Sequence, residues 1–192
     1  MAPLAPTPIT LKDGRALTLR SALPADIPAL CALTASVTNE RAFTLFEPHE
    51  LADAALRTAS RVRERHNDPD ELRMLAVIEH GPTPADASSV VGDLSIGAGR
   101  WARLAHCATV GIDIHRDYRR AGLGDAMLTT ALAWAAAHPR IERVELYVYA
   151  DNAPAIALYR KHGFLQEGRR ARYFKTPEGA YFDDLIMART VK

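Results

Sequence analysis

The chain has 192 residues, enough for a sizeable hydrophobic core, and we assign residues 1–192 to a single domain. Hydrophobic residues make up 48% and charged residues 24%, as in ordinary globular proteins, and no run of about 18 apolar residues marks a membrane span. The formal net charge of +1 gives no reason to expect nucleic acid or a membrane surface as a partner.

The first ten residues, MAPLAPTPIT, are rich in proline, and we expect residues 1–10 to be flexible. They lack the basic and apolar regions of a secretory signal peptide, so we expect a cytoplasmic protein. Cys31 and Cys107 lie far apart and form neither a metal-ligand spacing nor a redox spacing. We therefore expect no metal site.

The first half of the chain predicts strands, helices and loops in an order that indicates a mixed α/β fold. In sequence these are a strand at 16–20, a helix introduced by Pro24 and Asp26, an irregular segment at 37–47, a helix at about 48–65, a strand at 72–79, a turn-rich connector at 81–89, and a strand at 90–96.

Residues 105–114 read as the third strand of a meander, and residues 122–138 as a largely buried helix with apolar residues on several faces. A strand at 141–149 alternates cleanly, and a helix then runs from Asn152 to Gly163. Strands at 164–169 and 181–188, joined by a turn at 176–179, close the chain. No internal repeat or domain boundary is found.

The segment Val110 to Gly124, VGIDIHRDYRRAGLG, joins a strand to a helix through a basic, glycine-containing turn. Glycine lets backbone N–H groups approach an anion, and the N-terminus of the following helix favours negative charge. The turn therefore indicates a diphosphate site. The alternative is a glycine-softened turn that carries two surface arginines. It is not a dinucleotide fingerprint, because the third glycine position holds Met127.

A second motif runs from Asn152 to Phe164 and reads NAPAIALYRKHGF. Together with Arg119–Gly124 (RRAGLG), it resembles the GCN5-related N-acetyltransferase (GNAT) superfamily, with both motifs in the family's order. The resemblance implies a mixed, mostly antiparallel central sheet that is splayed at the acetyl-CoA site and flanked by about four helices. It also implies acetyl-CoA as cosubstrate and a small-molecule amine, such as an amino acid, as acceptor.

The resemblance also implies which residues bind acetyl-CoA. The pantetheine arm would pair with the free strand edge at the splay, the diphosphate would lie on the glycine turn, and an asparagine would contact CoA. These cofactor-binding residues are Ile112, Asp113, Ile114, Arg119, Arg120, Ala121, Gly122, Leu123, Gly124 and Asn152. For Asn152, a helix cap is the alternative role, and the two roles are compatible.

Tyr159 matches the family's tyrosine that donates a proton to the departing CoA thiolate. A phenol with a pKa of about 10 is protonated at neutral pH and needs no tuning to donate. The alternative is a tyrosine that only packs its helix on the sheet. The acceptor ammonium must also lose a proton, and three carboxylates are candidates for the base: Asp113, Asp183 and Glu40.

Other functions remain open from the sequence. A protein or peptide N-terminus could be the acceptor, or the chain could be a non-catalytic acyl-CoA-binding module. A Rossmann-type nucleotide-binding protein is disfavoured, because the strands before the glycine turn form a meander. A homodimer is common in the family, and the sequence leaves the oligomeric state open.

Overall fold

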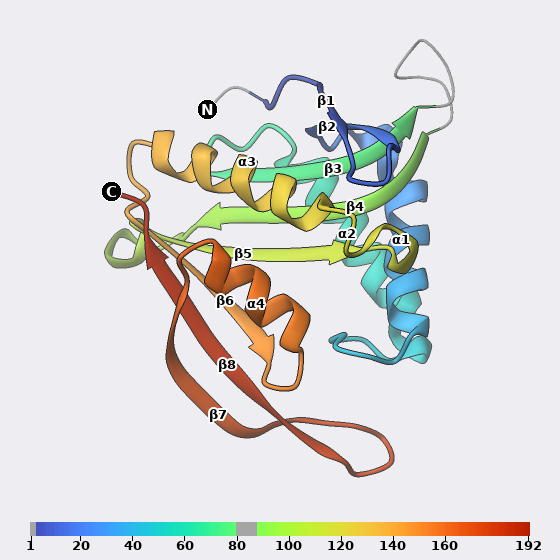
Figure 1. Ribbon diagram of the computed structural model, residues 1–192, viewed down its shortest axis with the longest axis vertical. Coiled ribbons are helices and arrows are strands. Elements are labelled where there is room, and N and C mark those ends of the chain that lie inside the picture. The colour runs from blue at the N-terminus through green and yellow to red at the C-terminus, as the bar shows by residue number, and fades with distance from the viewer. Residues whose placement is uncertain (1–2, 80–87) are drawn as a thin grey trace. The chain divides into compact units, whose positions relative to one another are not determined.

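The computed structural model describes residues 3–79 and 88–192, so the predicted connector at 81–89 lies almost entirely outside the described residues. Eight strands, mostly antiparallel, and four α-helices occur in the described part of the chain (Figure 1). This is the mixed α/β architecture that the sequence predicted. The chain forms two compact units, Met1–Gly97 with Ile112–Ala131 and Ala98–Gly111 with Leu132–Lys192.

The first unit contains four antiparallel strands in chain order and two helices between the second and third strands. Its elements are β1 (Thr7–Thr10), β2 (Ala16–Ser21), α1 (Ile27–Asn39), α2 (Leu51–Arg65), β3 (Glu71–Glu79) and β4 (Ser88–Ala98). A 3-10 turn with proline at its start leads into each helix. Pro24 and Pro48 suit this position because their fixed φ matches the first helical turn.

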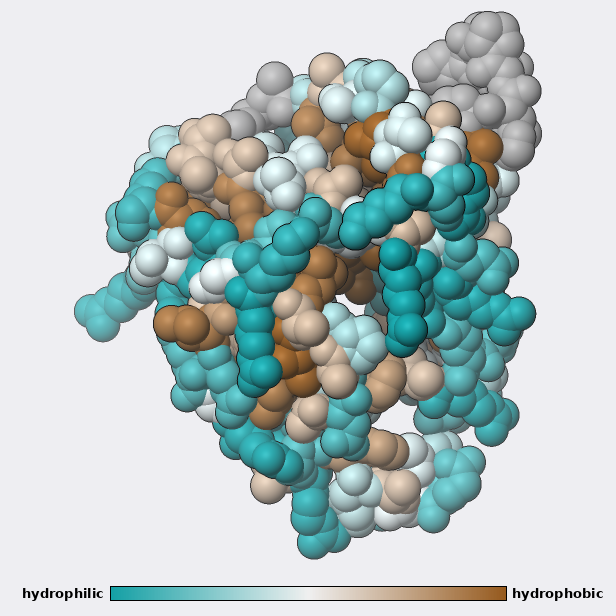
Figure 2. All heavy atoms as spheres, in the orientation of Figure 1, coloured by the Kyte–Doolittle hydropathy of each residue, from teal (hydrophilic) through white to brown (hydrophobic). Residues whose placement is uncertain are grey.

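The two helices lie side by side and bury one face each (Figure 1). On α1 the apolar residues Leu30, Leu33 and Val37 recur at helical spacing and pack in one cluster with Val62 of α2 and Leu75 of β3. The region of these two helices in Figure 2 is mainly hydrophilic, and its charged residues belong to α2, because α1 has none. Helix α2, which buries Ala54, Ala59 and Val62 and carries six charged residues, is therefore amphipathic, whereas α1 is apolar over most of its length.

Three elements contribute residues to both units: β4, by its last residue Ala98 alone, β5 (Cys107–Ile114) and α3 (Leu123–Ala137). In the first unit, Leu123 and Met127 of α3 are fully buried. Met127 approaches the backbone of β4 closely, since a Cβ added to Gly92 would lie 2.9 Å from the Met127 Sδ. The glycine at position 92 thus permits α3 to pack at this distance.

The second unit contains β6 (Arg143–Tyr149), α4 (Ala153–Lys161), β7 (Leu165–Lys175) and β8 (Tyr181–Thr190). Its strands follow the order β5-β6-β8-β7, with β5 parallel to β6 and the other pairs antiparallel. Val144, Leu146 and Val148 of β6 are buried and alternate with partly exposed residues, which confirms the predicted alternation. The strands β7 and β8 form a long hairpin (Figure 1).

The structure differs from the sequence prediction at two strands. The segment Thr7–Thr10, within the proline-rich start, pairs with β2 as the exposed strand β1. Strand β7 extends to Lys175, six residues beyond the predicted end. Both strands are mostly exposed and lack the apolar alternation by which a half-buried strand is detected. Of the helices in the described residues, none is long and apolar enough to cross a membrane.

One buried ion pair joins the two strands of the hairpin. The Arg170 Nε donates a hydrogen bond to the Asp184 Oδ2 at 2.8 Å, and Asp184 is fully buried. The Arg170 guanidinium also lies over two aromatic rings, 3.7 Å from the centre of Tyr173 and 4.7 Å from the centre of Tyr147. Such contacts add cation–π attraction to the ion pair.

Candidate active site

The glycine turn between β5 and α3 contains two residues with a positive φ. After β5 the chain makes a 3-10 turn at Arg116–Tyr118, and α3 begins at Leu123. Between them, Arg120 and Gly122 adopt left-handed conformations with φ of 61° and 94°. Glycine takes such a φ without steric cost, whereas the arginine takes it at a small cost. The predicted strand–turn–helix arrangement is therefore confirmed.

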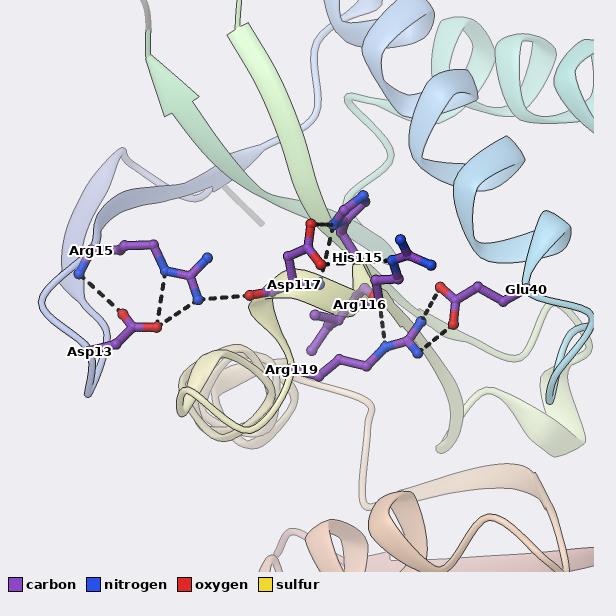
Figure 3. A network of polar contacts seen from close by, with 8 residues as sticks. Asp13, Arg15, Glu40, His115, Arg116, Asp117 and Arg119 are labelled. Carbon is purple, nitrogen blue, oxygen red and sulfur yellow. Dashed lines mark hydrogen bonds and ion pairs between the residues drawn. The ribbon is translucent and has the colours of Figure 1, made fainter.

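The turn is supported by the loop between β1 and β2 (Figure 3). The Lys12 amide donates to the Ala121 carbonyl at 3.0 Å, and the Arg15 Nη2 donates to the Asp117 carbonyl at 2.8 Å. Asp13 holds the Arg15 guanidinium through Nη2 at 2.6 Å. Sequence reasoning missed these residues, because Arg15 and Asp117 are 102 positions apart and no local motif links them.

The turn and the start of α3 have two features that favour a bound anion. The first turn of an α-helix leaves its N–H groups without intrahelical partners, and the dipole of this 15-residue helix adds positive potential there. A Cβ added to Gly122 would lie 3.5 Å from the Lys12 Cγ, which is ordinary contact. The positive φ of Gly122 therefore favours glycine at this position, and the space beside Lys12 does not.

Arg119, predicted to bind the diphosphate, has its side chain in an ion pair with Glu40 (Figure 3). Its Nη1 and Nη2 donate to the two carboxylate oxygens of Glu40 at 2.7 and 2.8 Å, and its Nε donates to the Ile114 carbonyl at 2.8 Å. Glu40 caps the C-terminal end of α1. Glu40 and Arg119, which have separate predicted roles, are thus in direct contact.

Asp113 lies opposite a second aspartate. The His115 amide donates to the Val91 carbonyl at 2.9 Å, and the antiparallel register that this bond sets places Asp113 of β5 across from Asp93 of β4. Asp93 in turn is held by Arg73 of β3 through bonds of 2.6 and 3.0 Å. Sequence reasoning did not single out Asp93 or Arg73.

The surroundings of Asp113 raise the pKa of its carboxyl group to about 6. The main cause is desolvation by the surrounding protein, followed by the negative charge of Asp93, while Arg73 and Arg119 act in the opposite direction. The side chain still has solvent access. Desolvation of the Asp113 carboxyl group by the protein is therefore partial.

In the second unit, the parallel pairing of β5 with β6 is short. It joins Cys107–Thr109 to Arg143–Glu145, and the described residues of this unit show no pair beyond Thr109 and Glu145. Both strands continue past that point, β5 through Val110 and Gly111. The two strands thus stop pairing partway along their length, as a splayed sheet requires.

The two predicted residues of α4 lie at its start and on its buried face. The Asn152 Oδ1 accepts a hydrogen bond from the Ala155 amide at 3.3 Å, which is the N-cap role that the sequence left open. Tyr159 is buried, with its ring edge-on to Phe164 at 5.9 Å between centres. A contact of either residue with CoA stays a prediction.

Asp183 is firmly held by its neighbours. Its carboxylate accepts from the Arg172 amide at 2.7 Å and from the Arg169 Nε at 2.6 Å. These two bonds, the backbone one first, lower the pKa of Asp183. Among the residues that the structure describes, no group of three or more His, Cys, Asp or Glu side chains is placed to hold a metal ion.

Comparison with known proteins assigns the family. Residues 35–164 match the model of the acetyltransferase (GNAT) family, which covers more than half of the chain. The structure is similar to that of a GNAT-family acetyltransferase from Streptococcus pneumoniae, with 28% identity, a TM-score of 0.78, and coverage of 91% of this chain and 99% of that one. The chain therefore belongs to the GNAT family of acetyltransferases.

Two curated relatives share part of the sequence. The L-amino acid N-acetyltransferase AaaT of Escherichia coli K12 is 36% identical over 100 residues, or 52% of this chain and 61% of that protein. An N-alpha-acetyltransferase of Sulfurisphaera tokodaii is 36% identical over 72 residues, 38% of this chain and 43% of that protein. The chain thus spans less than two thirds of the length of each.

Proposed function

We propose that the protein transfers an acetyl group from acetyl-CoA to the primary amine of a small molecule, with amino acids as the first acceptors to test. Family membership supports the reaction class, and the 36% identity with an L-amino acid N-acetyltransferase supports the acceptor class. The observation that carries the proposal is the glycine turn, where left-handed Arg120 and Gly122 lead into the N-terminus of α3.

In this proposal the first unit holds the CoA moiety. The backbone of Arg119–Gly124 and the first amides of α3 bind the diphosphate, and Arg120 adds an exposed positive charge beside them. The backbone of Ile112, Asp113 and Ile114 pairs with the amides of the pantetheine arm in the manner of an added strand.

Tyr159 of α4 is the proposed acid. Tyr159 donates its phenolic proton to the sulfur as the C–S bond of the thioester breaks, because a phenol is protonated at neutral pH. Asn152, which caps α4, contacts CoA with the part of its amide that the cap leaves available. The buried position of Tyr159 supports a fixed ring orientation, which an acid catalyst needs.

The experiment has two parts. Calorimetric titration with acetyl-CoA tests binding, and a thiol-release assay with amino acids, polyamines and short peptides tests turnover and ranks the acceptors. We expect acetyl-CoA to bind and at least one amino acid to release CoA thiol. Absence of acetyl-CoA binding would refute the proposal.

The second candidate is acetylation of a peptide N-terminus. The 36% identity with an N-alpha-acetyltransferase, over 72 residues, favours this candidate. Turnover of peptides but not of free amino acids would select it. If acetyl-CoA binds and no amine is turned over, the chain is an acyl-CoA-binding module on the same fold.

A further inference from the structure

Asp93 and Asp113 form a cross-strand pair of carboxylates in the first unit. The hydrogen bond from the His115 amide to the Val91 carbonyl sets the register that puts the two residues opposite each other. Side chains directly opposite on antiparallel strands point to the same face, with Cβ atoms about 5 Å apart. Two like charges in this position repel each other, so the pair costs stability unless one charge is neutralised.

Only one member of the pair is neutralised by a partner. Arg73 binds both carboxylate oxygens of Asp93, through Nε at 3.0 Å and Nη2 at 2.6 Å, and both side chains are largely buried. Asp113 has no hydrogen bond or ion pair with another described residue, and its side chain is open to solvent. Both oxygens of Asp93 are therefore held by Arg73, while the Asp113 carboxyl group is free to exchange a proton with solvent or a ligand.

The other two candidate bases differ from Asp113 in this respect. Glu40 gives both oxygens to Arg119, and Asp183 is held by the Arg172 amide and the Arg169 guanidinium. The bonds to Asp183 lower the pKa of its carboxyl group and make it a weak base, and both oxygens of Glu40 are already occupied by Arg119. Of the three, Asp113 alone combines solvent access with an untethered carboxylate.

We propose that Asp113 is the general base that takes the proton from the ammonium group of the acceptor. This inference deepens the proposed function and rests on it. Asp113 lies between Ile112 and Ile114, whose backbone is proposed to bind the pantetheine arm. Its side chain therefore belongs to the strand segment along which the arm and its thioester would lie. Asp93, clamped by Arg73, acts as a positioning residue that sets the proton affinity of Asp113.

The local charge also favours a cationic acceptor. The groups that face Asp113 electrostatically are Asp93 of β4, Arg73 of β3 and Arg119 of the glycine turn, and Arg119 is itself paired with Glu40. The site therefore contains three carboxyl groups (Asp93, Asp113 and Glu40) and two guanidinium groups (Arg73 and Arg119). The excess negative charge attracts an ammonium ion, which is the form of a primary amine that predominates at neutral pH.

The proton and electron balance is as follows. The Asp113 carboxylate takes one proton from the acceptor ammonium, which leaves a neutral amine with a lone pair. That lone pair forms the C–N bond at the acetyl carbonyl carbon, and the C–S bond breaks with its electrons on sulfur. The second proton of the reacting nitrogen goes to solvent, the sulfur takes a proton from Tyr159, and Tyr159 and Asp113 re-equilibrate with water.

The test is the pH profile of kcat/KM and of kcat with the best amine acceptor from the thiol-release assay. Because the base acts when deprotonated, wild-type kcat/KM should rise with pH through an apparent pKa near 6, which is that of the free enzyme. In Asp113→Asn, kcat near pH 7 should fall about 100-fold. Its activity should instead climb towards about pH 9, where the free amine becomes abundant.

Two further variants separate catalysis from folding. Asp93→Asn removes the like charge, so the acidic limb of the profile should move to lower pH, an effect that a merely structural residue would not produce. Asp183→Asn is the matched control, since it makes the same change at a carboxylate that is already hydrogen-bonded. The acidic limb of the pH profile of this variant should coincide with that of wild type. Circular dichroism and acetyl-CoA affinity check that each variant is folded.

The outcomes are distinguishable. An Asp113→Asn enzyme with kcat within about threefold of wild type and an unchanged acidic limb overturns the inference and leaves the proposed function intact. Loss of the limb in Asp183→Asn would assign the base to Asp183 instead. If the wild-type protein turns over no amine, the proposed function itself is wrong, whatever the variants do.

Discussion

Glu40 and Arg119 are 79 positions apart in the chain and meet in a two-pronged ion pair at 2.7 and 2.8 Å. The pair ties the end of α1 to the glycine turn. The guanidinium that the sequence assigned to a phosphate thus already has a carboxylate partner. A diphosphate that uses this guanidinium must compete with Glu40 for it.

The first prediction concerns this competition. In Glu40→Gln, acetyl-CoA should bind up to about fivefold more tightly, since a partly exposed ion pair contributes about 1 kcal/mol or less. Arg119→Gln should weaken binding and reduce its dependence on salt. Calorimetry at two ionic strengths measures both effects. Weaker binding in Glu40→Gln would show that the carboxylate orients Arg119 and does not compete for it.

The second prediction separates backbone strain from cofactor binding. Gly122→Ala should lower the melting temperature, because alanine at a φ of 94° is strained by about 1 kcal/mol, and should weaken acetyl-CoA binding at least tenfold. Gly179→Ala is the matched control, with a φ of 91° and no atom within 4 Å of the added Cβ. It should show similar destabilisation in a thermal melt and normal binding in calorimetry. Equal binding by both variants would remove Gly122 from the diphosphate site.

The third prediction concerns the acid. Tyr159→Phe keeps the ring that packs edge-on against Phe164 and removes only the hydroxyl. We expect kcat to fall about 100-fold while the affinity for acetyl-CoA stays near that of wild type. Steady-state kinetics and calorimetry measure the two quantities. An unchanged kcat would leave Tyr159 with a packing role only.

The fourth prediction is that Asp113 lowers stability at neutral pH. The pKa of its carboxyl group in the folded protein, about 6, lies above its ordinary value of 3.8, so the folded state binds protons more tightly than the unfolded state. Stability is therefore lost as pH rises between these two values. Asp113→Asn should melt at a higher temperature than wild type near pH 8, with the gap closing towards about pH 4. Thermal melts across this range measure it, and a gap that is independent of pH would contradict the assignment.

The fifth prediction concerns the β7–β8 hairpin. Arg170→Ala leaves the fully buried Asp184 without its guanidinium partner and should destabilise the protein by about 2 to 3 kcal/mol. The double variant Arg170→Ala with Asp184→Asn should lose less than the sum of the two single changes, because no unpaired buried charge remains. Urea denaturation of the four proteins completes the cycle. Strict additivity would mean that the two side chains do not interact.

Much of the fold could be predicted, because its elements carry strong local signals. Local signals predict all four α-helices: the spacing of apolar residues, proline at the start, or glycine at the end. The residue types of the glycine turn predict that turn in the same way. Strand β1 and the far end of β7 could not be predicted, since exposed strands have no apolar alternation.

Only those features of the candidate site that are formed by residues adjacent in the sequence could be predicted. The strand, the turn and the cap residue Asn152 all follow from adjacent residues. The support of the turn by Lys12 and Arg15, and the opposition of Asp93 to Asp113, depend on strand register and on contacts between distant segments. Register follows from pairing partners that a single sequence does not specify.

The first unit is assembled from two stretches of chain, Met1–Gly97 and Ile112–Ala131, with part of the second unit encoded between them. During synthesis on a ribosome, the earlier stretch emerges while the segment that pairs beside Val91 is still missing. Strand β4 is then an open edge with free backbone groups, a state that favours unwanted association. We expect nascent chains that end near residue 97 to be captured by chaperones, and chains that extend well past residue 131 to escape them.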